Sequence, residues 1–286
     1  MKKIKKAIVA VAGSGTRLLP ATKTMPKEML PIVDKPIIQL VVEELVEAGI
    51  EDIILVTKWD KKPLEDHFDY SWALVHELKK AGKEQLAEDV KKIADLANFI
   101  YVRQKGPYGN GTPVLSAANL VKDEPFVYVF GDDLVKSKSS FTKQMVEDYE
   151  KNGKLMIGVQ EVPRDQVNRY GIVKLRDSSK EIEDIIEKPS VEESPSQLAD
   201  FGRMILDQDV VDILQKTALG KGNELWIIDA IRTYIQHGGK FVAKEVEEGE
   251  WLTTGDPLNY IKAILKYAFD RKDLNGDLEE FIKSLK

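Results

Sequence analysis

The feature that most constrains the fold is a βαβ unit at the start of the chain. Residues 4–11 form a short apolar run of strand length, and Gly13 follows shortly after it. Residues 36–48 carry apolar side chains at helical spacing, with Pro36 suited to the first turn and Gly49 to the position after the last turn. Residues 53–56 predict a second buried strand. Strand, loop, helix and strand in this order predict a βαβ unit, from which parallel sheets are built.

The same alternation continues along the chain. Apolar runs at residues 100–103 and 126–130 predict further strands, and Thr112 is predicted to cap a helix between them with Pro113 in its first turn. A polar segment at 71–96 predicts a solvent-facing helical insertion. Runs at 155–162, 171–175 and 182–187 predict strands of mixed direction, and Asn223 is predicted to cap a helix that ends near residue 237.

These elements predict an α/β fold with a doubly wound, mostly parallel (Rossmann-like) mixed sheet flanked by helices. We expect one α/β domain over residues 1–256, with a nucleotide-binding half at about 1–135 and a sugar-binding half at about 136–256. Residues 257–286 predict a C-terminal helical tail. Its apolar positions, which include Tyr260, Ile264 and Phe269, need a partner surface, so we expect a homo-oligomer.

Composition excludes several classes of protein. The 286 residues carry a net charge of -6, which gives no general attraction to nucleic acid or to an anionic membrane, so we expect neither partner. The absence of cysteine excludes disulfides and thiolate chemistry, and three histidines make a His-rich metal centre implausible. The apolar run after the lysine-rich start is too short for a signal peptide. We therefore expect a cytoplasmic protein.

The loop after the first strand, residues 12–20, is rich in glycine but matches neither of the two common phosphate-binding signatures. The dinucleotide fingerprint needs a third glycine at position 18, where this chain has Leu18. It also needs an acidic residue at the end of the second strand, which ends in Val56 and Thr57. The Gly-Lys-Ser/Thr of a Walker loop is absent as well. These differences disfavour a dehydrogenase and leave a plain turn as the alternative.

Cations alternate with prolines just after this loop. Because proline fixes the backbone, the cations lie on a stiffened segment, which favours anion binding over a solvated basic loop. The residues concerned are Arg17, Lys23 and Lys27 with Pro20, Pro26 and Pro31.

Together these motifs resemble the sugar-phosphate nucleotidylyltransferases, and within them the bacterial-type UTP–glucose-1-phosphate uridylyltransferases. The most specific block runs from Gly13-Ser14-Gly15-Thr16-Arg17 through Pro26-Lys27-Glu28-Met29-Leu30-Pro31 to Asp34-Lys35-Pro36. Weaker matches follow in order over nearly the whole chain: Gln104 with Gly109, Gly131-Asp132-Asp133, Tyr170-Gly171, Glu187-Lys188-Pro189, Gly202-Arg203 and Asn223-Glu224.

The resemblance implies an enzyme that transfers a uridylyl group from UTP to glucose 1-phosphate with Mg²⁺. It implies that Arg17 and a loop containing Ala12, Gly13, Gly15 and Thr16 hold the triphosphate, and that Lys27 lies on the phosphates near the bond being broken. It implies that Gln104 and Gly109 read the base, that Asp132 binds the metal and that Lys188 binds the sugar phosphate. Glu187, with Tyr170, Gly171 and Gly202, is implied on the sugar side.

The residues themselves are consistent with this chemistry. A sugar phosphate oxygen is already ionised at neutral pH, so the reaction needs positioning and charge neutralisation rather than a general base. Asp132 directly follows a predicted buried strand, which suits a metal ligand, although an aspartate turn is the alternative. Glu187 and Lys188 would face opposite ways in a strand, so a break there is needed for both to reach one ligand.

Three departures from the family pattern leave alternatives open. Residues 109–113 read Gly-Asn-Gly-Thr-Pro rather than Gly-Leu-Gly-His-Ala, and Trp226 and Ile228 replace the usual Gln and Thr. Thr253 stands where a second metal-binding aspartate is expected; Asp256 is a possible substitute, although an N-terminal helix role suits it better. The alternatives are another sugar phosphate or dTTP as substrate, or a nucleotide-sugar binding protein that has lost turnover.

Overall fold

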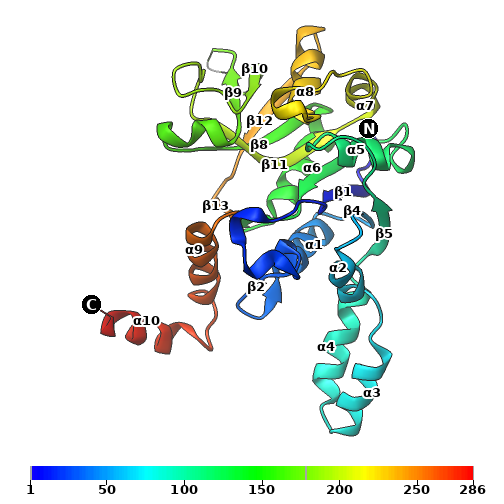
Figure 1. Cartoon of the computed structure of the whole chain (residues 1–286), viewed down its shortest axis with the longest axis vertical. Coiled ribbons are helices and arrows are strands. Elements are labelled where there is room, and N and C mark those ends of the chain that lie inside the picture. Colours follow the sequence, from blue (N-terminus) through cyan, green and yellow to red (C-terminus); the bar gives the residue numbers. More distant parts are fainter. Residues whose placement is uncertain (1, 178, 286) are drawn as a thin grey trace.

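The computed structural model describes residues 2–177 and 179–285. Within these residues, nine strands form the main sheet: β1 (Lys6–Ala10), β4 (Asp52–Thr57), β5 (Asn98–Arg103), β6 (Phe126–Phe130), β8 (Leu155–Glu161), β9 (Gly171–Leu175), β10 (Ile182–Glu187), β11 (Leu198–Leu206) and β12 (Phe241–Glu245). The predicted mixed, mainly parallel α/β sheet flanked by helices is confirmed (Figure 1).

The strand order is β10-β9-β11-β6-β1-β4-β5, and β8 pairs with both β11 and β12. Strands β6, β1, β4 and β5 are parallel, so their carboxyl ends meet at one edge of the sheet. Strand β11 is antiparallel to β6, β8 and β9, and it joins the strands of the two predicted halves into one sheet. The sheet therefore presents loops from both halves along a common edge.

The first βαβ unit forms as the sequence predicts. The helix α1 (Ile37–Glu47) begins after Pro36 and ends before Gly49, which has φ of 83°. Its face toward the core buries Ile37, Val41 and Leu45 completely. Strand β1 is equally buried, because it pairs with β4 on one side and β6 on the other. The loop that leaves β1 is thus anchored to a buried strand with a parallel partner on each side.

Two small antiparallel ribbons lie outside the main sheet. Strand β2 (Pro31–Ile32) pairs with β3 (Lys35–Pro36), and β7 (Asp133–Ser137) pairs with β13 (Gly249–Thr253). The second ribbon brings residues about 120 positions apart in sequence side by side, since Thr253 lies opposite Asp133.

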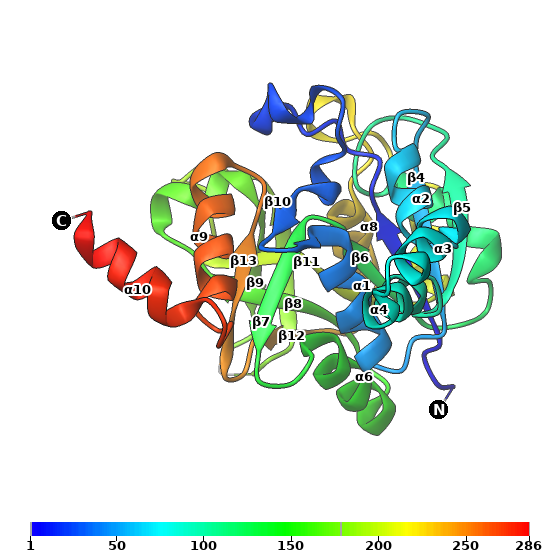
Figure 2. The ribbon, with the colours of Figure 1, turned by 90° about the horizontal axis from the view of Figure 1, so that it is seen from below.

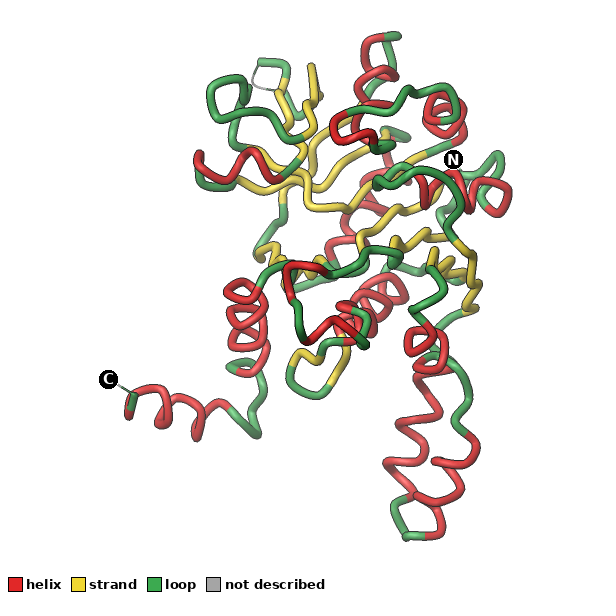
Figure 3. The backbone as a smooth tube through the Cα atoms, viewed as in Figure 1, coloured by secondary structure: helices red, strands yellow, loops and turns green. Residues whose placement is uncertain are grey.

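Helices lie against the sheet and its edges, and other helices project away from it (Figure 3). Helix α5 packs against β1 and β4, α8 against β10, and α1 against α6. Their bounds are α2 (Lys62–His67), α3 (Trp72–Lys80), α4 (Glu84–Ala94), α5 (Thr112–Ala117), α6 (Phe141–Asn152), α7 (Gln208–Leu214), α8 (Ile227–Gln236), α9 (Pro257–Ala268) and α10 (Asn275–Ser284). The predicted helical insertion is the α3–α4 hairpin, which extends away from the sheet (Figure 1).

Two predicted helix caps are wrong. Thr112 is the first residue of α5, after Gly111, and its hydroxyl donates to the Pro107 carbonyl instead of capping. Helix α8 begins at Ile227 rather than after Asn223, which lies in a short 3-10 helix, η6 (Lys221–Asn223), with φ of 61°. By contrast, the Ser140 hydroxyl accepts a hydrogen bond from the Lys143 amide and caps α6.

The chain ends in two helices, and only the second extends away from the body of the protein. Helix α9 packs against β13, whereas α10 extends away from the sheet in both views (Figures 1 and 2). Of residues 2–177 and 179–285, no helix combines the length and the apolar character needed to cross a membrane.

Candidate active site

The glycine loop and the basic segment fold back on each other at the end of β1. Gly15 has φ of 64°, in the left-handed region that favours glycine, and starts the 3-10 helix η1 (Thr16–Leu18). The Thr22 hydroxyl donates to the Gly15 carbonyl at 2.7 Å and closes the loop. Lys27 begins a further 3-10 helix, η3 (Lys27–Met29), and a Cβ placed on Gly13 would lie 3.4 Å from its Nζ. The loop therefore surrounds the Lys27 ammonium.

Lys27 pairs with the carboxylate that follows β6. Its Nζ lies 2.5 Å from Oδ2 of Asp132. Burial alone would raise the pKa of Asp132, but the Lys27 ammonium, together with Lys61 and Arg17, holds the pKa below its ordinary value. Burial likewise opposes the charge on Lys27, yet Asp132 raises the pKa of the lysine. Both groups are therefore charged near neutral pH, and each supplies charge at the mouth of the same loop.

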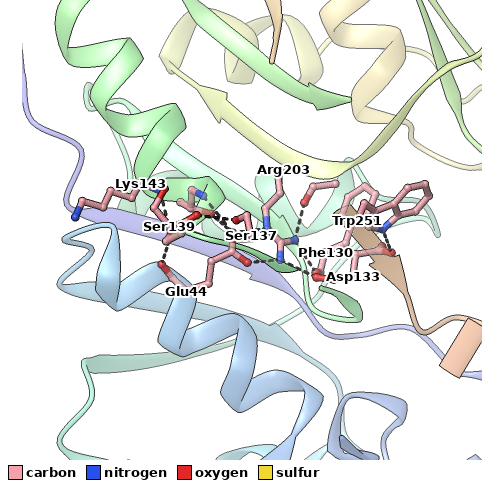
Figure 4. A network of polar contacts seen from close by, with 11 residues as sticks. Glu44, Phe130, Asp133, Ser137, Ser139, Lys143, Arg203 and Trp251 are labelled. Atoms are coloured by element: carbon pink, nitrogen blue, oxygen red, sulfur yellow. Dashed lines mark hydrogen bonds and ion pairs between the residues drawn. The ribbon is translucent and has the colours of Figure 1, made fainter. Parts of the chain in front are cut away.

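Asp133, the next residue, belongs to a buried network with Trp251, Arg203 and Glu44 (Figure 4). Its carboxylate accepts a hydrogen bond from Trp251 Nε1 at 2.8 Å, and its carbonyl accepts one from Arg203 at 2.7 Å. Arg203 is fully buried and pairs with Glu44 at 2.9 Å. Burial and the Asp132 charge raise the pKa of Asp133 to about 7. The network fixes the backbone at the end of β6 and engages the Asp133 carboxylate with Trp251, whereas Asp132 pairs with Lys27; both aspartates line the cleft.

The β7–β13 ribbon completes this side of the site. The Thr254 hydroxyl donates to the Asp132 carbonyl at 2.5 Å, and Thr253 lies beside it. A Cβ placed on Gly255 would lie 3.3 Å from an Arg17 guanidinium nitrogen and 3.9 Å from Asp132 Oδ2. Asp256 accepts from the Asn259 amide and caps α9, as predicted, and it pairs with Arg169 at 2.8 Å. Asp256 is thus committed to the helix and to Arg169.

A second loop, after β5, faces the same cleft. The backbone amide of Gln104 extends the sheet by donating to the Thr57 carbonyl at 2.8 Å. Gly109 has φ of 122°, and a Cβ there would lie 2.1 Å from the Leu225 carbonyl oxygen, so only glycine fits. The Leu225 amide donates to the Tyr108 carbonyl at 2.7 Å. The loop that follows β5 is therefore held against the segment that leads into α8.

The Glu187–Lys188 pair lies at the end of β10, where the strand breaks. Lys188 has φ of 44°, and its amide donates to the Tyr170 carbonyl at 2.9 Å. The break brings the Lys188 Nζ within 3.5 Å of the Glu187 carboxylate, so both side chains reach one site, as predicted. Burial raises the pKa of Glu187 to about 7, although Lys188 acts against it. A Cβ placed on Gly171 would lie 3.4 Å from a Glu187 carboxylate oxygen. Because glycine has no Cβ, the space beside this carboxylate stays open.

These residues line one cleft of about 390 Å³ at the carboxyl edge of the parallel strands. On one side it takes Ala12, Gly13, Arg17, Lys27, Gln104 and Gly109 from the predicted set. Asp132 lines it beside Lys27, and the other side has Tyr170, Gly171, Glu187 and Lys188. Gly15, Thr16 and Gly202 do not line it. A larger hollow of about 970 Å³ along β5 contains none of the predicted site residues.

Gly202 serves the sheet instead of the cleft wall. It has φ of 74°, a Cβ there would lie 2.1 Å from the Phe130 ring, and its amide donates to the Asp200 carboxylate. Sequence reasoning missed Asp200, Arg169 and Trp251 as cleft residues. They come from three separate elements, and no motif or spacing links them.

The whole chain resembles nucleotidyl transferases. The nucleotidyl transferase family model matches residues 6–269. A Staphylococcus saprophyticus protein named UTP–glucose-1-phosphate uridylyltransferase 2 is 45% identical over 289 residues, covering 100% of this chain and 99% of that protein. The Bacillus subtilis UTP–glucose-1-phosphate uridylyltransferase is 43% identical over 288 residues, covering 100% and 98%.

Solved structures agree with these relatives. A UTP-bound UGPase from Acinetobacter baumannii matches with a TM-score of 0.89 and 36% identity, covering 99% of this chain and 100% of the other. A UDP-glucose pyrophosphorylase complexed with UDP-glucose matches with a TM-score of 0.83 and 40% identity, covering 94% and 100%. The similarity therefore extends over the cleft as well as the core of the sheet.

Proposed function

This chain belongs to the nucleotidyl transferase family, and we propose that its cleft transfers a uridylyl group from UTP to glucose 1-phosphate, giving UDP-glucose and pyrophosphate. One observation carries the proposal. A single cleft is lined by Arg17 and Lys27, by Asp132 paired with Lys27, and by the Glu187–Lys188 pair. Two phosphorylated substrates can therefore meet in one cleft that also holds an ionised carboxylate. The full-length relatives named as UTP–glucose-1-phosphate uridylyltransferases support this choice of substrates.

The chemistry is a displacement at the α-phosphorus of the triphosphate. A phosphate oxygen of the sugar phosphate forms the new P–O bond, and the bond to the bridging oxygen breaks, so that its electron pair leaves with pyrophosphate. The nucleophile is already ionised, and no proton has to be removed. Arg17 and Lys27 bind the triphosphate and stabilise the charge that shifts toward the leaving group. Lys188 binds the sugar phosphate and orients it.

The remaining predicted contacts divide between the two walls. We propose that Gln104 and Gly109 read the base, because the side-chain amide of Gln104 offers both a donor and an acceptor to a pyrimidine. Backbone amides of Ala12 and Gly13 face the phosphates, and Gly15 and Thr16, which do not line the cleft, form the turn that holds this loop. On the other wall, Glu187 accepts hydrogen bonds from sugar hydroxyls and Tyr170 and Gly171 shape its surroundings, whereas Gly202 acts through the backbone of β11, outside the cleft lining.

The residues fit Mg²⁺ when it is shared with substrate phosphates. Asp132 is ionised and faces the cleft, and a carboxylate with phosphate oxygens and water is a common Mg²⁺ environment. Among the residues that the structure describes, no three acidic or histidine side chains converge to hold a metal alone. Thr253 offers only a neutral hydroxyl. Bound there, Mg²⁺ would neutralise phosphate charge.

The test is pyrophosphate release over a panel of triphosphates and sugar 1-phosphates. We expect the highest rate with UTP and glucose 1-phosphate. A faster rate with dTTP or with a hexosamine phosphate would change the substrate but keep the reaction. No turnover with any pair, combined with binding of UDP-glucose, would show a nucleotide-sugar binding protein instead.

We also propose that the chain forms a homo-oligomer through its C-terminal helices. Leu258 and Ile261 on α9 are 61% and 53% exposed, and Phe281 on α10 is 59% exposed. Apolar side chains on helices that project from the body are suited to a partner surface.

A further inference from the structure

A closed ring of three contacts holds Lys188 from outside its own strand. The Lys188 Nζ lies 3.9 Å from the centre of the Trp226 ring. Trp226 Nε1 donates to the Lys221 carbonyl at 2.9 Å, and the Lys221 Nζ donates in turn to the Lys188 carbonyl at 2.9 Å. The ring therefore joins the end of β10 to the segment between η6 and α8 through both the backbone and the side chain of Lys188.

Trp226 is itself rigidly placed. Its side chain is largely buried, and Leu225 and Ile227 on either side donate their amides to Tyr108 and to Asn110 at 2.7 and 2.9 Å. Both acceptors belong to the loop that follows β5, on the nucleotide wall. The indole is consequently fixed relative to the nucleotide wall of the cleft, whereas a free lysine side chain would sample many rotamers.

The position of the Lys188 ammonium is set by two attractions. The Glu187 carboxylate lies 3.5 Å from it, and the Trp226 ring lies against it. Without the ring, the carboxylate and water would be the main partners of this side chain, which is 32% exposed. An aromatic face attracts a cation but leaves its hydrogen-bond donors free. The ammonium is thus held in place with donors available to a phosphate.

We propose that Trp226 is a positioning residue that holds the Lys188 ammonium for the phosphate of the sugar substrate. The inference rests on the proposed function, because it assigns Lys188 to that phosphate. Trp226 acts through Lys188 and through no contact of its own with the reacting atoms. Where the family usually has glutamine, the Trp226 ring restrains the Lys188 side chain by a cation–π contact instead of a hydrogen bond.

The test compares Trp226→Leu with Trp226→Phe in steady-state kinetics, varying each substrate at a saturating level of the other. Loss of the cation–π contact in Trp226→Leu should raise KM for the sugar phosphate about tenfold. KM for the triphosphate should stay within about twofold. Trp226→Phe keeps an aromatic face and should recover most of the loss. Trp59→Leu is the control, because Trp59 is 85% exposed and lies outside the cleft.

Lys221→Met gives a second test at an exposed residue, where misfolding is not an issue. It removes one hydrogen bond of the ring and should raise the same KM about threefold. Equal increases in both KM values for Trp226→Leu would overturn the proposal, as would a Trp226→Phe enzyme no better than Trp226→Leu. If wild type turns over no substrate pair, the proposed function fails separately. Calorimetric binding of glucose 1-phosphate then decides the role of Trp226 by the same ratios.

Discussion

Removing Lys61 should destabilise the protein strongly, because it leaves a buried carboxylate without its partner. Glu28, next to Lys27 in the cleft, is 0% exposed and lies 2.6 Å from Lys61, which is 3% exposed. The other Glu28 oxygen, Oε1, has no hydrogen-bond partner among the described residues. Breaking such a pair from one side costs about 3–5 kcal/mol. A typical domain is stable by about 5–15 kcal/mol, so Lys61→Met should lose a large part of its free energy of unfolding.

The effect should depend on pH in a defined direction. Burial already raises the pKa of Glu28, and Lys61 is the main group that opposes it. Without Lys61, folded protein takes up a proton on Glu28 at a pH where the unfolded chain stays ionised. The cost of Lys61→Met should therefore be larger at pH 8 than at pH 5. Adding Glu28→Gln removes the buried charge, so the double variant should recover part of the loss at pH 8.

The assay is urea unfolding of wild type, the two variants and Lys62→Met, followed by fluorescence. Lys62 pairs with Asp66 on the surface, where both side chains are more than half exposed, and its loss should change stability by less than about 0.5 kcal/mol. A Lys61→Met variant that loses less than about 1 kcal/mol at pH 8 would refute the reasoning. So would a double variant that is less stable than the single one.

Three further predictions concern the cleft and the tail. Asp132→Asn should abolish pyrophosphate release at any workable Mg²⁺ level, while Thr253→Asp should lower the Mg²⁺ concentration for half-maximal rate; an active Asp132→Asn enzyme contradicts the metal assignment. Burial raises the pKa of Glu187 from 4.5 to about 7, so its contribution to stability is full at low pH and is lost as pH rises through 7. Between pH 4 and pH 8, wild type should lose about 3 kcal/mol relative to Glu187→Gln in urea unfolding, and parallel pH profiles would contradict this. Sedimentation velocity should show an oligomer at micromolar protein, and a monomer alone would dispose of the assembly.

The sequence predicts the parts of the fold in which structure is set by neighbouring residues. The apolar runs that became β1, β4 and β6 lie between turns, and each is buried on both faces in the structure. The break at Lys188 followed from two opposite charges that had to reach one ligand, and the structure has φ of 44° there. The resemblance grouped distant motifs that the structure places around one cleft: Gln104 and Asp132 follow β5 and β6, whereas Gly171 begins β9 and Glu187 ends β10.

The sequence did not predict the strand at the centre of the sheet. Strand β11 contains Asp200, Gly202 and Arg203, which interrupt the apolar pattern of a buried strand. Burial of the Arg203 charge is tolerated because the Glu44 carboxylate, from α1, lies 2.9 Å away. No local pattern reports a partner 159 positions earlier in the chain. The β7–β13 ribbon escaped prediction for the same reason.

The departures from the family pattern are connected in space. Helix α8 begins after Trp226, whose indole cannot cap the first amides of the helix. Asn110, at the position where the family often has leucine, supplies the missing acceptor, since its Oδ1 takes the Ile227 amide at 2.9 Å. Trp226 is then free to turn its ring toward Lys188. Asn110 and Trp226 each depart from the family motif. Together they attach the loop after β5 to the segment that restrains Lys188, and this attachment fixes the two walls of the cleft relative to each other.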